Sequence, residues 1–227
     1  MIPRKKIDLK KENIIKNCKH CLGKSCSICS AKCLRLEKYA YANIPVEYWD
    51  KSFKDFSGDS NFKKSMSLKI KDIDGTYERG KSLIFIGTLG TGKSYTASCL
   101  LKRALTAGYT GLYVTMADVV AKILSSEIDT SKYYKNLVGA DFLVIDEFSS
   151  HWIFPSEKSE QLFGSSLEFV LRTRFQNQLP TILCSNDSDV DEVFGGFFAK
   201  SFKSLRTHHT ELFVIGGKDY RRKNARC

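Results

Sequence analysis

The sequence has no long hydrophobic run. Its longest apolar stretches, around residues 83–86 and 142–145, have the length of a β-strand, whereas a membrane helix needs about 18 apolar residues in succession. The first residues are basic, and no apolar segment of the kind found in a secretory signal peptide follows them. These absences favour a cytoplasmic protein with no membrane partner.

Acidic residues are scarce at both ends of the chain. Residues 1–38 hold eleven Lys and Arg against three acids, and residues 218–227 hold five against one. Residues 39–217 sum to −1, so the net charge of +11 lies in the two ends. Basic ends attract polyanions, of which nucleic acid is the obvious one. A lysine-rich surface that serves only solubility is the alternative.

Internal repeats and low-complexity segments are also absent. Composition divides the chain into a cysteine-rich head (1–36), a connector into the next domain (37–80), a body (81–217) and a basic tail (218–227). In the body, apolar runs alternate with segments of helical spacing. This alternation predicts an α/β fold in which a parallel sheet carries helices on both faces. The expected strands are 82–86, 111–115, 142–145, 180–184 and 212–215, and the expected helices are 93–107, 117–124 and 161–175.

A glycine-rich motif follows the first expected strand. Residues 87–94 fit G-x-x-x-x-G-K-[ST], the phosphate-binding loop of P-loop NTPases. The glycines allow successive N–H groups to point inward around an anion, and the helix that follows adds the positive end of its dipole. We expect Lys93 to bind the β- and γ-phosphates of ATP and the Ser94 hydroxyl to ligate Mg²⁺. Nucleotide contacts are predicted at Gly87, Thr88, Gly90, Thr91, Gly92, Lys93, Ser94 and Tyr95.

Two acids end the strand expected at 142–145. We expect Asp146 to hold the Mg²⁺ ion, because the carboxyl ends of parallel strands meet at the edge of the sheet where ligands bind. Glu147 is the expected catalytic base that activates water. Asn186, at the end of another buried run, is a candidate for sensing the γ-phosphate, although asparagine at this position is also a common turn former.

Read together, these residues resemble the DnaC/DnaI-like helicase loaders of bacteria and phages, and their relative IstB, a transposition ATPase. All belong to the AAA+ superfamily of ASCE-type P-loop NTPases. The similarity begins at 42–48, passes through the phosphate-binding loop and Asp146-Glu147, continues in 172–186 and closes at 217–221. It implies an AAA+ ATPase that is weak alone and assembles as a homo-oligomer.

The resemblance also implies an arginine that completes the ATP site of a neighbouring subunit. The family's serine-arginine-leucine stretch corresponds here to 202–206, where Ser204 stands at the expected arginine position. Arg206 or Lys203 could substitute by a small shift, and Arg174 is a second candidate.

Five cysteines fall within a short segment, at Cys18, Cys21, Cys26, Cys29 and Cys33, with His20 inside the first pair. Two C-x2-C pairs supply four thiolates, enough for a tetrahedral Zn²⁺ site. We expect Cys18 and Cys21 to act together with any two of the other three; an iron–sulfur cluster is the alternative. So short a segment buries too little apolar surface to fold unaided, which indicates a structural metal. DnaI-like loaders carry a comparable module that contacts the helicase.

Three functions follow as hypotheses. The first is an ATP-dependent loader in DNA replication, which binds a replicative DNA helicase through its head and single-stranded DNA through its ATPase ring. Aromatic and basic residues near 197–203 suit stacking on single-stranded DNA. The second is an IstB-like ATPase that regulates a transposase on duplex DNA. The third is a nucleotide-switched adaptor without significant hydrolysis, against which Glu147 argues.

Overall fold

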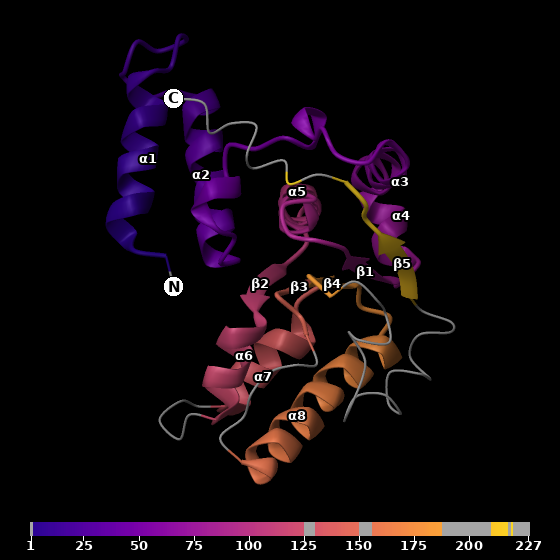
Figure 1. Cartoon of the computed structure of the whole chain (residues 1–227). Coiled ribbons are helices and arrows are strands. Elements are labelled where there is room, and N and C mark those ends of the chain that lie inside the picture. The colour runs from indigo at the N-terminus through magenta and orange to yellow at the C-terminus, as the bar shows by residue number, and fades with distance from the viewer. Residues whose placement is uncertain (1, 125–129, 150–155, 188–209, 218, 220–227) are drawn as a thin grey trace. The chain divides into compact units, whose positions relative to one another are not determined.

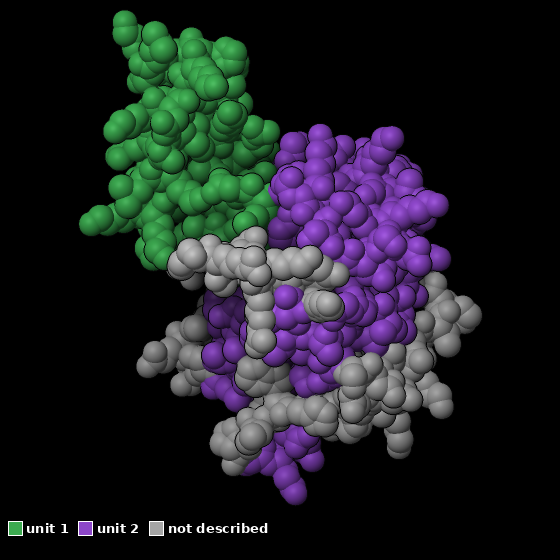
Figure 2. All heavy atoms as spheres, turned by 45° about the horizontal axis from the view of Figure 1, so that its top comes forward, with its two compact units in different colours: residues 1–51 green, residues 52–227 purple. Residues whose placement is uncertain are grey.

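The computed structural model describes residues 2–124, 130–149, 156–187, 210–217 and 219. The chain forms two compact units, Met1–Lys51 and Ser52–Cys227 (Figure 2). The sequence-based boundary at residue 36 differs from this division. It falls inside a helix that continues to Tyr41.

The first unit is a pair of packed helices, α1 (Arg4–Lys16) and α2 (Ser27–Tyr41). Ile7 and Leu36 are buried, and Lys11 forms an ion pair with Glu37 across the two helices. The cysteine-containing turn joins the helices. Beyond α2, a 3₁₀ turn at Val46–Tyr48 follows, and the Trp49 indole N–H donates to the carbonyl oxygen of Ile44 at 2.8 Å.

The second unit is built on a five-stranded parallel sheet of order β2-β3-β4-β1-β5. The strands are β1 (Ser82–Ile86), β2 (Gly111–Thr115), β3 (Phe142–Asp146), β4 (Thr181–Ser185) and β5 (Thr210–Val214). β1, β3 and β4 are buried along their whole length, as their continuous apolar runs predict. β4 lies between β1 and β3, the arrangement expected for an extra strand between the two nucleotide-binding strands.

Helices cover both faces of this sheet (Figure 1). The helices of the second unit are α3 (Ser60–Lys71), α4 (Ile73–Glu78), α5 (Lys93–Ala107), α6 (Met116–Leu124), α7 (Thr130–Gly139) and α8 (Glu157–Gln176). α3, α4 and α5 lie on one face, and α6, α7 and α8 on the other (Figure 1). Side chains of α6–α8 such as Val119, Leu137 and Leu167 are fully buried in one cluster with Leu143 and Ile145 of β3. The predicted α/β fold is confirmed.

The parallel sheet brings several predicted site residues to one edge. The phosphate-binding loop follows β1, Asp146 ends β3, and Asn186 comes directly after β4. Because the strands are parallel, all three positions lie at the carboxyl edge of the sheet. No helix in the described part of the chain is long and apolar enough to cross a membrane.

Candidate functional site

The phosphate-binding loop curls around the amine of Lys93. Lys93 begins α5 and is only 5% exposed. Its Nζ donates to the carbonyl oxygens of Gly87 at 2.7 Å and Thr88 at 2.8 Å. The Thr91 hydroxyl also donates to the Thr88 carbonyl at 2.9 Å, which braces the turn. A buried ammonium group therefore lies inside the loop, where an anion would be neutralised.

Two glycines of this loop have both a conformational and a steric reason to be glycine. Gly90 and Gly92 have φ values of +77° and +95°, which L-residues rarely adopt. A Cβ on Gly92 would lie 2.5 Å from Cε2 of Phe56, and one on Gly90 would lie 1.9 Å from a carboxylate oxygen of Asp219. Phe56 and Asp219 thus lie against the loop. The sequence reasoning gave neither a site role, although Asp219 belongs to the closing motif of the family resemblance.

Tyr95 holds the segment before α3 against the start of α5. Its hydroxyl donates to the carbonyl oxygen of Ser52, and its ring lies 6.1 Å from that of Phe56. Burial raises the pKa of Tyr95 to about 12. Ser94, the predicted Mg²⁺ ligand, is partly buried on the same first turn of α5.

Asp146 is held in place by two donors. The hydroxyl of Tyr113 donates to its Oδ2, and the backbone N–H of Glu147 donates to its Oδ1 at 3.0 Å. Tyr113 is 2% exposed and lies on β2, the strand next to β3. These bonds fix the carboxylate and leave its remaining lone pairs for a cation. Tyr113 escaped the sequence reasoning because, within an apolar run, a tyrosine indicates only a core position.

The backbone after β3 turns sharply at Glu147. Glu147 is exposed and has a φ of +55°, in the left-handed region. The next residue, Phe148, is fully buried, and its N–H donates to the Cys184 carbonyl of β4 at 2.8 Å. This anchor leaves the Glu147 side chain at the surface of the site. Asn186 is also exposed, at the same edge of the sheet, and the catalytic roles of both remain predictions.

The prediction that Arg174 completes a neighbouring subunit's ATP site is wrong. Arg174 is fully buried, and its guanidinium donates hydrogen bonds within its own chain. Its donors reach the Thr181 hydroxyl at 2.9 Å and five backbone carbonyls, those of Leu137, Val138, Ala140, Asp141 and Pro180, at 2.6–3.4 Å. The other two candidates, Lys203 and Arg206, lie outside the described residues.

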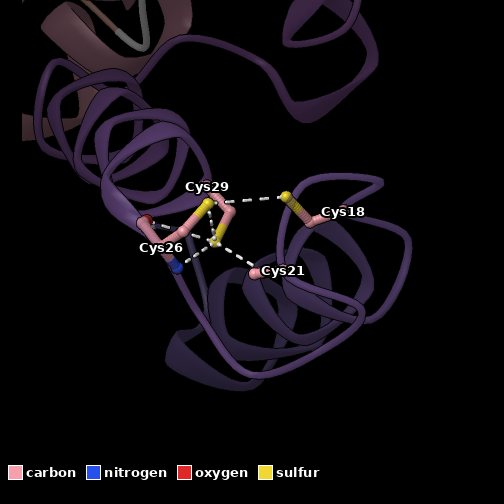
Figure 3. A group of neighbouring side chains, drawn as sticks. All are labelled: Cys18, Cys21, Cys26 and Cys29. Carbon is pink, nitrogen blue, oxygen red and sulfur yellow. Dashed lines mark hydrogen bonds between the residues drawn. The ribbon is translucent and has the colours of Figure 1, made fainter.

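Four of the five clustered cysteines converge in the first unit (Figure 3). The cysteine cluster consists of Cys18, Cys21, Cys26 and Cys29, whose sulfur atoms all lie within 4.8 Å of one another. Sulfur–sulfur distances are 3.7 Å for Cys18–Cys26 and Cys26–Cys29, and 3.8 Å for Cys21–Cys29. Cys33 points elsewhere, and its thiol donates to the Lys11 carbonyl at 3.9 Å.

These distances fit a single tetrahedral ion. Zn–S bonds of about 2.3 Å place the sulfurs of a tetrahedron roughly 3.8 Å apart, whereas a disulfide requires about 2.05 Å. An iron–sulfur cluster would hold some of the four thiolates further apart, because they are divided between two or four iron atoms. The Cys26 N–H donates to Cys29 Sγ at 3.0 Å and lowers the pKa of Cys29 to about 7, whereas burial raises that of Cys21 to about 12. A divalent cation would remove the cost of packing these thiolates together.

Comparison with known proteins agrees with the geometry of the second unit. The family described as IstB-like ATP binding protein matches residues 54–227. The chain belongs to this IstB-like family. The match includes the phosphate-binding loop and both acids at the end of β3, and it leaves the cysteine cluster outside. The chain is thus an AAA+ ATP-binding protein with an additional N-terminal unit.

Curated relatives of this IstB-like protein come from insertion sequences. It is 27% identical over 186 residues to an IS21 protein of Pseudomonas aeruginosa that is named for ATP binding, covering 78% of this chain and 67% of the relative. An IS21-like protein of Bacteroides fragilis is 27% identical over 129 residues, covering 56% of this chain and 62% of the relative. The alignments therefore span about two thirds of these relatives' lengths.

Solved structures share the fold at lower identity. The DnaC helicase loader superposes with a TM-score of 0.62 at 18% identity, covering 76% of this chain and 100% of that one. DnaI superposes with a TM-score of 0.60 at 17% identity, covering 76% of this chain and 94% of that one. These likenesses establish the AAA+ fold.

The contact between Tyr113 and Asp146 gives a testable expectation. In Tyr113→Phe, Asp146 loses one of the two donors that orient it, at a cost of about 1 kcal/mol. We therefore expect the Mg²⁺ concentration needed for half-maximal ATP retention to rise roughly five-fold. Tyr109→Phe is the matched control, because Tyr109 also donates to a carboxylate, that of Asp74, at 2.9 Å, away from the site. Equal Mg²⁺ requirements in the two variants would contradict a role for Tyr113 at the metal.

Proposed function

We propose that this IstB-like protein is a Mg²⁺-dependent ATPase that acts with a transposase on duplex DNA. Lys93 and the N–H groups of the phosphate-binding loop bind the phosphates. Ser94 and Asp146 supply the hydroxyl and carboxylate oxygens that suit Mg²⁺, which neutralises charge on the β- and γ-phosphates. Glu147 orients and deprotonates the attacking water, and Asn186 contacts the γ-phosphate.

The presence of Glu147 is the reason to propose ATP hydrolysis and not ATP binding alone. Asp146 already provides a metal ligand, and its carboxylate is engaged by Tyr113 and the backbone. Glu147 is a second carboxylate at the same strand end, and it is exposed. A protein that only bound ATP would have no need of this additional base.

The transposase is the proposed partner because the curated relatives are insertion-sequence proteins. The test measures ATP turnover by the full chain with and without duplex DNA and the cognate transposase. Turnover should be weak for the chain alone and rise when both are added. Lys93→Ala should lose ATP retention and turnover together. Wild-type protein that retains ATP without turnover under any of these conditions would favour the nucleotide-switched adaptor.

A replicative helicase loader is the second candidate, and the cysteine cluster favours it. The cluster lies in a unit that the IstB-like family match does not include. DnaI-like loaders use such a module to contact the helicase, and single-stranded DNA would replace duplex DNA as the ligand. Parallel pull-downs against a hexameric replicative helicase and a transposase distinguish the two. Capture of the helicase alone would replace the transposase proposal.

The cysteine cluster is proposed to bind a structural Zn²⁺. We expect Cys29→Ser, which removes a fully buried ligand, to abolish zinc retention and unfold the first unit. Cys33→Ser is the matched control, because its sulfur lies outside the cluster. It should keep one zinc per chain by elemental analysis. Equal zinc content in both variants would contradict this ligand set.

We also propose that the chain assembles as a homo-oligomer. A homo-oligomer in which Arg206 or Lys203 reaches the ATP of the next subunit is consistent with the family resemblance. With Arg174 excluded, these two are the remaining candidates.

A further inference from the structure

The first unit contains a pocket beside the cysteine cluster, and Cys18 and Cys29 of the cluster form part of its wall. This basic pocket has a volume of about 390 Å³, within the range of small-ligand sites. It lies where the end of α1, the cysteine turn and the first turns of α2 meet. Its lining consists of Asn13, Ile14, Asn17, Cys18, Lys19, His20, Cys29 and Lys32.

No acidic residue is among those that line the pocket. Residues 13–36 contain five Lys and Arg and no Asp or Glu. A Zn²⁺ ion with four thiolates carries a net charge of −2, so this stretch keeps a net charge of about +3 even with the metal bound. The remaining positive charge attracts an external anion.

Lysines of the first unit differ in whether their charge is already satisfied. Lys10 and Lys11, on α1, form ion pairs with Asp50 and Glu37. Within the described part of the chain, Lys19 and Lys32 have no such pair, and both are exposed at the pocket. The free ammonium groups therefore lie where a ligand can reach them.

We propose that the basic pocket binds a phosphate of the DNA backbone. Lys19, Lys32 and His20 offer donors to the phosphate oxygens, and the partly buried Ile14 offers an apolar wall to the sugar. Lys16 and Lys24 also form no ion pair with the residues that the structure describes, and they suit a ligand whose charge repeats along its length. This proposal rests on the proposed function only for the choice of DNA as the polyanion. The pocket itself does not depend on the ATP site, because the two lie in different units.

Fluorescence anisotropy of the full-length, zinc-loaded chain with labelled duplex and single-stranded oligonucleotides of equal length tests the proposal. The variant is Lys19→Gln with Lys32→Gln. The matched control is Lys5→Gln with Lys6→Gln, which removes the same charge from two exposed lysines at the other end of α1. We expect the pocket variant to bind DNA about ten-fold more weakly. The slope of log K against log salt should fall by roughly 1.5–2, as for two lost phosphate contacts. The control should change affinity by less than about three-fold.

Three outcomes would contradict the proposal that the basic pocket binds a DNA phosphate. Equal losses in the two variants would indicate diffuse attraction to the basic end of the chain. Unchanged affinity in the pocket variant would remove Lys19 and Lys32 from the interface. Polyglutamate of matched charge that competed as well as unlabelled DNA would indicate an acidic protein segment as the ligand. Zinc content and ATP retention of each variant are measured in parallel, so a failed ATPase proposal and a failed pocket proposal give different results.

Discussion

Glu147→Gln is expected to stop ATP hydrolysis while leaving ATP bound. The substitution keeps the size of the side chain and the backbone N–H that donates to Asp146. It removes only the negative charge that activates water, so turnover should fall by a factor of about 10²–10⁴. Retention of ATP with Mg²⁺ should change by less than about three-fold, since Lys93 and Asp146 are intact.

The matched control for this experiment is Glu157→Gln. Glu157 is an exposed glutamate in the first turn of α8. It loses the same charge, and its turnover should equal that of the unmodified protein. Turnover is measured as phosphate release at saturating ATP in the presence of DNA and partner. If Glu147→Gln hydrolysed ATP at the rate of this control, Glu147 would not be the catalytic base.

The sequence determined the nucleotide-binding framework well, because each part is local. The fit of residues 87–94 to the motif rests on backbone conformations that only glycine adopts readily, as the φ values of Gly90 and Gly92 confirm. The strand ending in Asp146 was visible as an apolar run followed by acids.

Contacts that cross the sheet were not accessible in this way. Tyr113 meets Asp146 only because β2 and β3 are neighbours, and nothing in the local sequence specifies that pairing. The spacing of the cysteines left open which two of Cys26, Cys29 and Cys33 would join Cys18 and Cys21 at the metal. The first turn of α2 brings Cys26 and Cys29 into the cluster: Cys26 caps the helix and Cys29 lies three residues on. Cys33 lies a further turn along, and its thiol donates to the Lys11 carbonyl.

Arg174 shows how a motif can indicate importance and mislead about its cause. The resemblance to the helicase loaders made Arg174 a candidate for completing the ATP site of a neighbouring subunit. The side chain instead turns inward and binds carbonyls at the end of α7 and the starts of β3 and β4. Carbonyls in the last turn of a helix have no partner within it, and they carry the negative end of its dipole. The buried Arg174 guanidinium donates hydrogen bonds to these carbonyls and places a positive charge at the negative end of the dipole.

Arg174→Met is therefore expected to destabilise the second unit by about 3–5 kcal/mol. Burial lowers the pKa of Arg174 to about 10, which leaves it charged at neutral pH. Methionine fills much of the volume but removes the donor to six acceptors, five carbonyls and the Thr181 hydroxyl. Of these, the Pro180 carbonyl keeps a second donor, the N–H of Leu143 at 3.2 Å. For a unit of this size the midpoint of thermal unfolding should fall by on the order of 10 °C.

Arg172→Met, two residues earlier on α8, is the control. Arg172 is half-exposed and pairs with Glu168, one turn away, so its loss should cost less than about 1 kcal/mol. Arg174→Lys should fall between the two, since one ammonium cannot reach carbonyls on three elements at once. If calorimetry found Arg174→Met as stable as Arg172→Met, the buried guanidinium would not be what joins α7 to the sheet. A normal unfolding midpoint combined with lost assembly-dependent turnover would instead return Arg174 to the subunit interface.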